Sequence, residues 1–263
     1  MGISTLHKKA SLWGAFFVSA LLSLPASALC PLLGDAETVH VERVVDGDTV
    51  RLADGRRVRL IGVNAPEMGG QGRPGEPYAQ AARRFLAEQV DANGGVLHLL
   101  PGIERLDGHG RQLAHLYDQN GRNLSALLLQ SGLAFQVAVA PNLRLVECFQ
   151  QQENQARGAG RGLWRDDPYI APSRLTGPGF ALVRGRVAKV ERNRGVTWLE
   201  IDGGLVLRID PRHRPSFSGV DLQALIGRTV EVRGWVVERS RRVRWLLDLQ
   251  HPALLVQAPE AGM

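Results

Sequence analysis

Residues 40–67 read HVERVVDGDTVRLADGRRVRLIGVNAPE, and their pattern sets the kind of fold to expect. Val41, Val44 and Val45 lead into the Asp46-Gly47-Asp48 segment, and apolar residues alternate with polar ones on both sides of Asp54-Gly55. An alternation of period two is typical of half-buried strands, and Asp-Gly is a strong signal for a tight hairpin turn. These residues therefore predict three extended strands joined by tight turns.

The chain that follows, up to about residue 165, predicts a helix, two more strands and terminal helices. Apolar residues have helical spacing over 78–90, the short segments 96–100 and 112–117 are predicted as strands, and 124–131 and 143–157 are predicted as helices. Three strands, a helix and two strands with a helical flank describe a small Greek-key barrel of the OB type.

A second run repeats this order of elements. Strands are predicted at 182–190, 196–201 and 205–209, then a short helix at 220–226, then strands at 230–237 and 243–249. The expected fold class is mainly β with flanking helices, as two consecutive barrels. We predict an OB-fold barrel over 36–165, a Pro- and Gly-rich linker over 166–176, and a smaller OB-like barrel over 177–257.

The composition is that of a globular protein with an uneven charge. Of the 263 residues, 44% are hydrophobic and 22% are charged, which excludes a mostly disordered chain. Residues 171–263 hold 15 basic and 9 acidic side chains, so the whole formal charge of +6 lies in the last third. A basic surface attracts polyanions, and both nucleic acid and an anionic membrane qualify.

The first 28 residues have the pattern of an export signal. Lys8 and Lys9 precede an apolar run of about fifteen residues, shorter than the roughly 20 that span a bilayer. Ala26-Ser27-Ala28 supplies the small residues that a signal peptidase requires. We predict cleavage after Ala28 and a periplasmic or secreted protein. The alternatives are an uncleaved membrane anchor, or lipid attachment at Cys30, which the bulky Leu29 disfavours.

Both cysteines lie in the predicted mature chain. An even number in an oxidising compartment favours one disulfide between Cys30 and the helix that carries Cys148. Two free thiols are the alternative.

Several polar residues occur where the strands of the first barrel end. Asp48 follows a strand, and Asn64-Ala65-Pro66-Glu67 follows the third strand. Phosphodiester cleavage needs a cation held by oxygen ligands, a group that orients the attacking water, and donors for the developing charge. Since strand ends in a small barrel can converge on one rim, these residues predict a hard-cation site.

Two arginines complete this set. Arg59 lies on the third strand, and the Asp107-Gly108-His109-Gly110-Arg111 turn places Arg111 at the start of another strand. A guanidinium matches the geometry of a phosphate. Each residue also has an ordinary structural interpretation, such as Asp48 as a turn former or Arg111 as cover for an apolar patch. The combination favours the functional interpretation.

The segments around Asp48, from Arg59 to Glu67, and from Asp107 to Arg111 resemble the three signature segments of the staphylococcal nuclease (thermonuclease) family. The closing Gly-x-Gly-Leu-Trp164 is also similar, and the resemblance covers about residues 40–165. It implies calcium-dependent cleavage of DNA and RNA. It further implies an exported bacterial homologue in which the second barrel is a C-terminal OB-like extension.

The resemblance also implies a role for each site residue. Asp48, Asn64 and the backbone carbonyl of Ala65 would bind the metal, with Mg²⁺ or Mn²⁺ as substitutes for Ca²⁺. Glu67 would orient or deprotonate the attacking water. Arg59 and Arg111 would hold the scissile phosphate and stabilise the transition state.

The chain departs from the family pattern in two respects. Asn64 stands where the family has aspartate, so the site loses one negative charge and weaker or altered metal binding is expected. The family's lysine and tyrosine contacts to the nucleotide correspond here to Gly108, His109, Val137 and Val139, so base stacking by these positions is expected to be lost.

The second barrel carries arginines interleaved with Trp198, Trp235 and Trp245. Such a pattern on an OB barrel suits single-stranded nucleic acid, because aromatic rings stack on bases and arginines follow the phosphates. Core tryptophans beneath a solvated arginine face are the alternative, and both interpretations stay open. The arginines are Arg184, Arg186, Arg192, Arg194, Arg233, Arg239, Arg241, Arg242 and Arg244.

The sequence thus predicts an exported, metal-dependent nuclease that acts on DNA, RNA or both, without a covalent intermediate. One alternative is a non-catalytic nucleic-acid-binding protein with a degenerate metal site, which Asn64 favours and the retained Glu67 disfavours. Another is an envelope protein that binds a protein or glycan, since OB barrels host many ligands.

Overall fold

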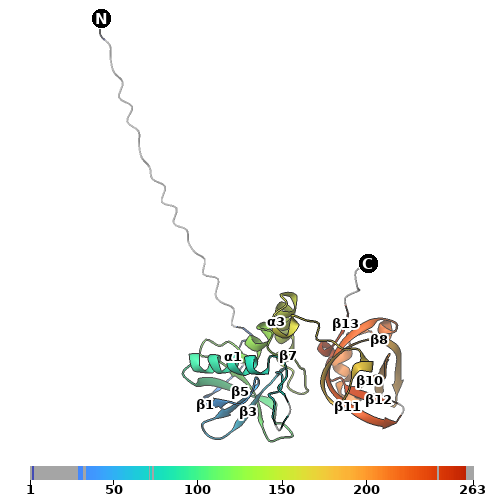
Figure 1. Ribbon diagram of the computed structural model, residues 1–263, viewed down its shortest axis with the longest axis horizontal. Coiled ribbons are helices and arrows are strands. Elements are labelled where there is room, and N and C mark those ends of the chain that lie inside the picture. Colours follow the sequence, from blue (N-terminus) through green and yellow to red (C-terminus); the bar gives the residue numbers. More distant parts are fainter. Residues whose placement is uncertain are drawn as a thin grey trace.

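The computed structural model describes residues 2, 29–31, 34–70, 72, 74–241 and 243–258. Two β-rich units lie beside each other, with the helix α3 near their junction (Figure 1). Apart from Gly2, the predicted export signal lies outside the described residues. Arg242 also lies outside them. In the described part of the chain, no helix combines the length and apolar content needed to cross a bilayer.

The first unit is a closed five-stranded barrel in the order β1-β2-β3-β6-β5. Its strands are β1 Glu37–Val44, β2 Thr49–Leu52, β3 Arg57–Leu60, β5 Val96–Leu106 and β6 Gln112–Tyr117. All neighbours pair antiparallel except β3 and β6, which are parallel. This confirms the OB-type prediction, and a short pair adds β4 Val63–Asn64 to β7 Phe135–Gln136.

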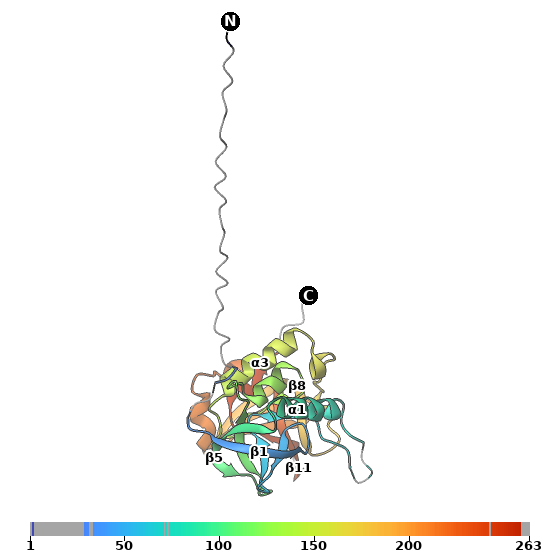
Figure 2. The ribbon, with the colours of Figure 1, turned by 90° about the vertical axis from the view of Figure 1, so that its left-hand side faces the viewer.

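Three helices cover this barrel: α1 Ala79–Ala92, α2 Leu124–Gln130 and α3 Val146–Gly158. Figure 2 shows α1 alongside β1 and β5. One face of α1, with Ala82, Leu86 and Val90, is buried in the barrel core, as the helical spacing of its apolar residues predicts. From α3, Phe149 enters the same core. A Cβ at Gly62 would lie 2.2 Å from the Phe149 ring, so only glycine permits this approach.

A disulfide between Cys30 and Cys148 ties the N-terminal segment to α3, as predicted. Cys30 is buried and packs in the core of the first barrel.

The second unit repeats the first in strand order. Its strands are β8 Gly179–Asn193, β9 Val196–Ile201, β10 Leu205–Ile209, β11 Thr229–Arg241, β12 Val243–Asp248 and β13 Leu255–Gln257. The sheet order is β12-β10-β9-β8-β11-β13, and an additional β11–β12 pairing makes it barrel-like. The parallel pair β10–β12 corresponds to β3–β6 of the first barrel. Its core is rich in valine and leucine and also includes Ala138 and Val146 of the first unit.

The connecting segments are the 3₁₀ helices η1 Gly162–Trp164, η2 Pro172–Arg174, η3 Pro211–Phe217, η4 Gln223–Leu225 and η5 Pro252–Leu254. The helix predicted over 220–226 is therefore only the single turn η4, in which no residue is fully buried and Leu225 packs partly buried against the core of the second barrel. Residues 166–176, predicted as a linker, are in contact with the barrels: Tyr169 and Leu175 are buried, and Ile170 bridges to Val183 on β8.

Candidate active site

The predicted site residues meet at the rim of the first barrel, where β2 begins and the chain leaves β3. Thr49 pairs with Arg59 across the β2–β3 hairpin, which brings the preceding Asp48 beside Arg59. A Cβ at Gly47 would lie 2.6 Å from the Cβ of Ala65, so the Asp46-Gly47-Asp48 turn packs directly against the loop after β4. The glycine is thus required for the turn to reach that loop.

Asp48 is buried, and both of its carboxylate oxygens are engaged. Oδ1 accepts a hydrogen bond from the Thr49 hydroxyl at 3.1 Å, and Oδ2 accepts one from the Ala65 amide at 2.7 Å. Arg59 Nη1 forms an ion pair with Oδ2. The carboxylate is therefore held rigidly, and its orientation is fixed by two segments and one cation.

Arg59 also donates from Nη2 to Asn64 Oδ1 at 3.1 Å. A carboxylate oxygen and an amide oxygen are thus directed at one guanidinium. The structure brings together Asp48, Asn64, Ala65 and Arg59, as the sequence predicts.

Asp46 is a member of this cluster that sequence reasoning treated only as part of a turn. Burial raises the pKa of Asp48, the positive charge of Arg59 opposes the rise, and the neighbouring Asp46 carboxylate adds to it. The Asp46 Oδ1 also accepts a hydrogen bond from the Asp48 amide at 3.0 Å. The signal in the sequence was that Asp46, the first residue of Asp46-Gly47-Asp48, is a second carboxylate two residues from Asp48.

Arg111 reaches the same rim from the start of β6. Its Nε donates to Asp107 Oδ2 at 2.7 Å, and its Nη1 lies 3.5 Å from the Thr49 hydroxyl. Burial raises the pKa of Asp107, but hydrogen bonds from Arg111 and from the backbone outweigh this effect and keep that pKa below its ordinary value. Asp107 therefore stays ionised and orients the guanidinium.

Arg59 and Arg111 line one cavity of about 380 Å³. It also contains residues of the β5–β6 hairpin and Val137 and Val139, the positions at which the resemblance predicts lost nucleotide contacts. His109 is exposed, as expected for a turn residue, and is one of the residues that line this cavity.

Glu67 lies apart from this cluster. Its side chain is exposed, and Glu67 contacts Glu76 through its backbone: the Glu67 amide donates to Glu76 Oε2 at 2.9 Å, and the Glu67 carbonyl accepts from the Glu76 amide at 3.0 Å. Glu67 shares a larger neighbouring cavity with Asn64. The structure thus places it next to the site but does not join it to Asp48 or Arg59.

The donor atoms suit a hard divalent cation. The Asp48 carboxylate and the Asn64 amide supply oxygen ligands, and Ala65 is held against Asp48. Arg59 already neutralises the carboxylate, so a cation would have to share these oxygens with it. In the described part of the chain, no group of three or more His, Cys, Asp or Glu residues could hold a metal ion, so backbone and amide oxygens would have to contribute.

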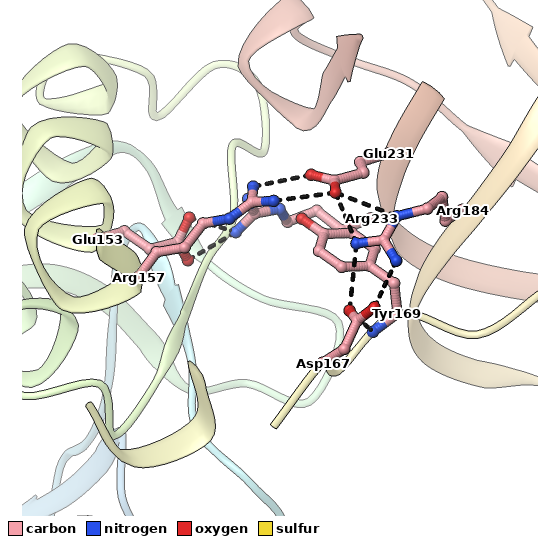
Figure 3. Close-up of polar contacts among 7 residues, drawn as sticks. All are labelled: Glu153, Arg157, Asp167, Tyr169, Arg184, Glu231 and Arg233. Carbon is pink, nitrogen blue, oxygen red and sulfur yellow. Dashed lines mark hydrogen bonds and ion pairs between the residues drawn. The ribbon is translucent and has the colours of Figure 1, made fainter. Parts of the chain in front are cut away.

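The second barrel is fixed to the first by buried ion pairs (Figure 3). Arg233 on β11 contacts Glu153 on α3 at 2.6 Å, and both side chains are buried. Glu231, also on β11 and 1% exposed, accepts hydrogen bonds from Arg157 on α3 and from Arg184 on β8, and Arg184 also pairs with Asp167. Burial raises the pKa of Glu231, but Arg157 and Arg184 outweigh this effect and keep that pKa below its ordinary value.

These contacts limit the predicted nucleic-acid face of the second barrel. Arg233 is engaged in an ion pair between the units, Arg184 pairs with Glu231 inside the second barrel and with Asp167 of the connecting segment, and Trp245 is a core residue. Trp198 is half-buried, whereas Trp235 is 45% exposed and lines both cavities of the first barrel's rim. Sequence reasoning named Trp235 but could not place it at the site.

Comparison with known proteins gives a consistent picture. The model of the family described as staphylococcal nuclease homologue matches residues 57–166. The thermonuclease of Staphylococcus intermedius is 31% identical over 131 residues, covering 49% of this chain and 76% of that protein. In Bacillus subtilis (strain 168), the SPbeta prophage-derived endonuclease YokF is 28% identical and endonuclease YncB is 29% identical.

The matches with the two Bacillus proteins cover 53% and 50% of this chain, but only 48% and 64% of the relatives' own lengths. Residues 57–166, which the family model matches, lie almost entirely in the first unit, and that unit holds the cluster of Asp48, Arg59, Asn64 and Arg111. The family model, the similarity to thermonuclease and the closed barrel agree on one conclusion: the chain belongs to the staphylococcal nuclease family.

Proposed function

We propose that this protein is an exported, metal-dependent nuclease that hydrolyses phosphodiester bonds of DNA, RNA or both. The observation that carries the proposal is the convergence of Arg59 and Arg111 on one cavity, with oxygens of Asp48 and Asn64 in direct contact with the Arg59 guanidinium. Family membership and the names of the relatives support the same chemistry.

In this proposal the two arginines bind the scissile phosphate. Arg111 is held by Asp107, and Arg59 by Asp48 and Asn64, so both guanidiniums are oriented before substrate arrives. Preorganised donors of this kind stabilise the negative charge that develops on the phosphate oxygens, at little cost in reorganisation.

Asp48, Asn64 and the Ala65 carbonyl would hold the cation, with Asp46 adding negative charge nearby. We propose Ca²⁺, with Mg²⁺ and Mn²⁺ as candidates for substitution. A bound divalent cation would supply Lewis-acid stabilisation of the phosphate. Glu67, exposed at the adjoining cavity, would orient or deprotonate the attacking water.

The proposed location, periplasmic or secreted, is supported by the export-like pattern of residues 1–28 and by the Cys30–Cys148 disulfide, since such bonds persist in oxidising compartments.

The decisive experiment is cleavage of single-stranded DNA, duplex DNA and RNA by the protein lacking residues 1–28, with Ca²⁺, Mg²⁺ or Mn²⁺ and with chelator. We expect cleavage that a divalent ion supports and that chelator abolishes, and a loss of turnover in Glu67→Gln. Binding of nucleic acid without cleavage under any of these ions would instead favour the non-catalytic alternative.

A further inference from the structure

The outer face of β11 is turned toward the first barrel. Val230, Val232 and Val236 lie in the core of the second barrel. Because side chains of a strand alternate between its faces, Glu231, Arg233, Trp235 and Val237 share the opposite face. Glu231 and Arg233 meet α3 of the first unit through their ion pairs (Figure 3).

Those two ion pairs fix the strand just before Trp235. Arg233 is 6% exposed and Glu153 is 1% exposed, so their contact is shielded from solvent. A desolvated pair with good geometry is sensitive to displacement of either partner. Trp235, two residues further along the same face, is therefore held at a defined place relative to the first barrel.

Aromatic side chains pack against one side of Trp235. Its ring contacts Phe180 in an edge-on arrangement with centroids 5.2 Å apart, and Phe180 in turn stacks on Phe135 of the first unit at 6.1 Å. Phe135 meets Trp164 at 5.4 Å. This row supports the indole from one side, while 45% of the residue remains exposed.

Trp235 borders both cavities next to the site. One cavity, about 380 Å³, contains Arg59 and Arg111, and the other, about 1100 Å³, contains Asn64 and Glu67. In the first cavity Trp235 is the only Phe, Tyr or Trp among the lining residues, and the first barrel contributes Val137 and Val139 there. A large exposed indole beside two phosphate-binding guanidiniums is suited to stack on a nucleobase.

We propose that Trp235 of the second barrel is a substrate-binding residue, on which a base of a single-stranded nucleic acid stacks while Arg59 and Arg111 hold an adjoining phosphate. The second barrel thereby supplies the aromatic contact that the first barrel lacks. The proposal rests on the proposed function for the identity of the ligand. A paired base keeps its faces covered by its neighbours, so the preference is for single strands.

The test measures the affinity of the Glu67→Gln protein for a fluorescein-labelled single-stranded oligonucleotide, and for the matching duplex, by fluorescence anisotropy in Ca²⁺ buffer. Adding Trp235→Ala should raise the Kd for the single strand at least about fivefold, the lower end of what losing one base stack costs. Trp235→Phe should restore most of the affinity. Ile226→Ala is the matched control, because Ile226 is 46% exposed on the same barrel but lines neither cavity.

A Kd for Trp235→Ala within twofold of its parent would overturn the proposal. The proposal would also be overturned if Trp235→Ala raised the Kd equally for the single strand and the duplex, or if the Glu67→Gln parent bound neither oligonucleotide. Because Trp235 is exposed, its replacement should fold, which thermal unfolding checks. The two proposals fail separately: retained, Trp235-dependent binding with no cleavage by the unsubstituted protein overturns the nuclease function alone.

Discussion

At the scale of single residues, Asn64 is the position where this site carries less charge than its resemblance to the family implies. Its Oδ1 accepts from Arg59 at 3.1 Å, beside the Asp48 carboxylate. Asn64→Asp adds an anionic oxygen to the cation site, so we expect tighter Ca²⁺ binding, by tenfold or more, measured by isothermal titration calorimetry. An unchanged or weaker affinity would show that Asn64 is not a ligand.

His115 makes stability depend on pH. It is buried among Tyr117 and Phe149, and burial, with the positive charge of Arg144, lowers its pKa to about 4. As the pH falls, the imidazole of His115 is therefore protonated in the unfolded chain before it is protonated in the folded protein. The contribution of His115 to the free energy of unfolding is complete above pH 6.5 and falls as the pH drops from 6.5 toward 4. The loss due to this group approaches about 3 kcal/mol.

The check is denaturant unfolding of the parent and of His115→Leu at a series of pH values between 7 and 4. We expect the variant to lose less stability than the parent over this interval. Parallel pH profiles would contradict the assignment.

Much of the site was accessible from the sequence, but not all of it. The proximity of Asp48, Arg59 and Asn64 follows from strand pairing, which alternation and turn residues predict. The orientation of Glu67 depends on a loop without periodicity, so no pattern could say whether it meets Asp48. Asp46 was missed because a turn-forming aspartate and a charge contributor look the same in sequence.

At the scale of elements, three strands bounded by turn residues, β6, β9 and β10, were predicted to the residue. The strands β8 and β11 extend beyond their predicted ends, because their outer portions are rich in polar residues and are paired through the backbone, which leaves no hydrophobic signal. The row of valines predicted the inner face of β11, but not what its outer face meets.

The helix α3 is fixed at its first turns by the Cys30–Cys148 disulfide, which closes a sequence separation of 118 residues. In the chain-entropy account a loop of this size contributes up to about 5 kcal/mol by restricting the unfolded state. Cys148→Ser should therefore lower the thermal unfolding midpoint by several degrees, and a reducing agent should do the same to the parent but not to the variant. Equal midpoints for parent and variant would contradict a structural role for the bond.

At the scale of the whole molecule, two barrels of equal strand order are joined by buried charges, with Trp164 and Tyr169 packed beneath the arginines. Sequence reasoning treated the arginines of the second barrel as one set. Two of them, Arg184 and Arg233, pair with acids far along the chain, and charge content cannot reveal pairing over such a separation.

Glu153→Gln leaves Arg233 buried without its ionised partner, and it also weakens the acceptor of the Gln136 amide. We expect the free energy of unfolding to fall by about 3–5 kcal/mol because a buried ion pair at the junction is broken. We also expect two calorimetric transitions in place of one, as the barrels unfold independently. The control is Arg208→Ala, which breaks a more exposed ion pair with Asp248 inside the second barrel and should cost about 1 kcal/mol or less. A single, unshifted transition for Glu153→Gln would contradict the coupling.

Two arginines that flank β6, Arg111 and Arg122, allow a direct test of phosphate binding at the rim of the first barrel. Arg111 is held by Asp107, and Arg122 by Asp118, in the same arrangement, with an Nε–Oδ2 distance of 2.7 and 2.6 Å. Only Arg111 lines the cavity that contains Arg59. The measurement is the turnover of single-stranded DNA by Arg111→Ala and Arg122→Ala, both checked for folding. We expect turnover to fall at least about a hundredfold for Arg111→Ala and to stay near that of the parent for Arg122→Ala. Equal turnover in the two variants would contradict phosphate binding at this rim.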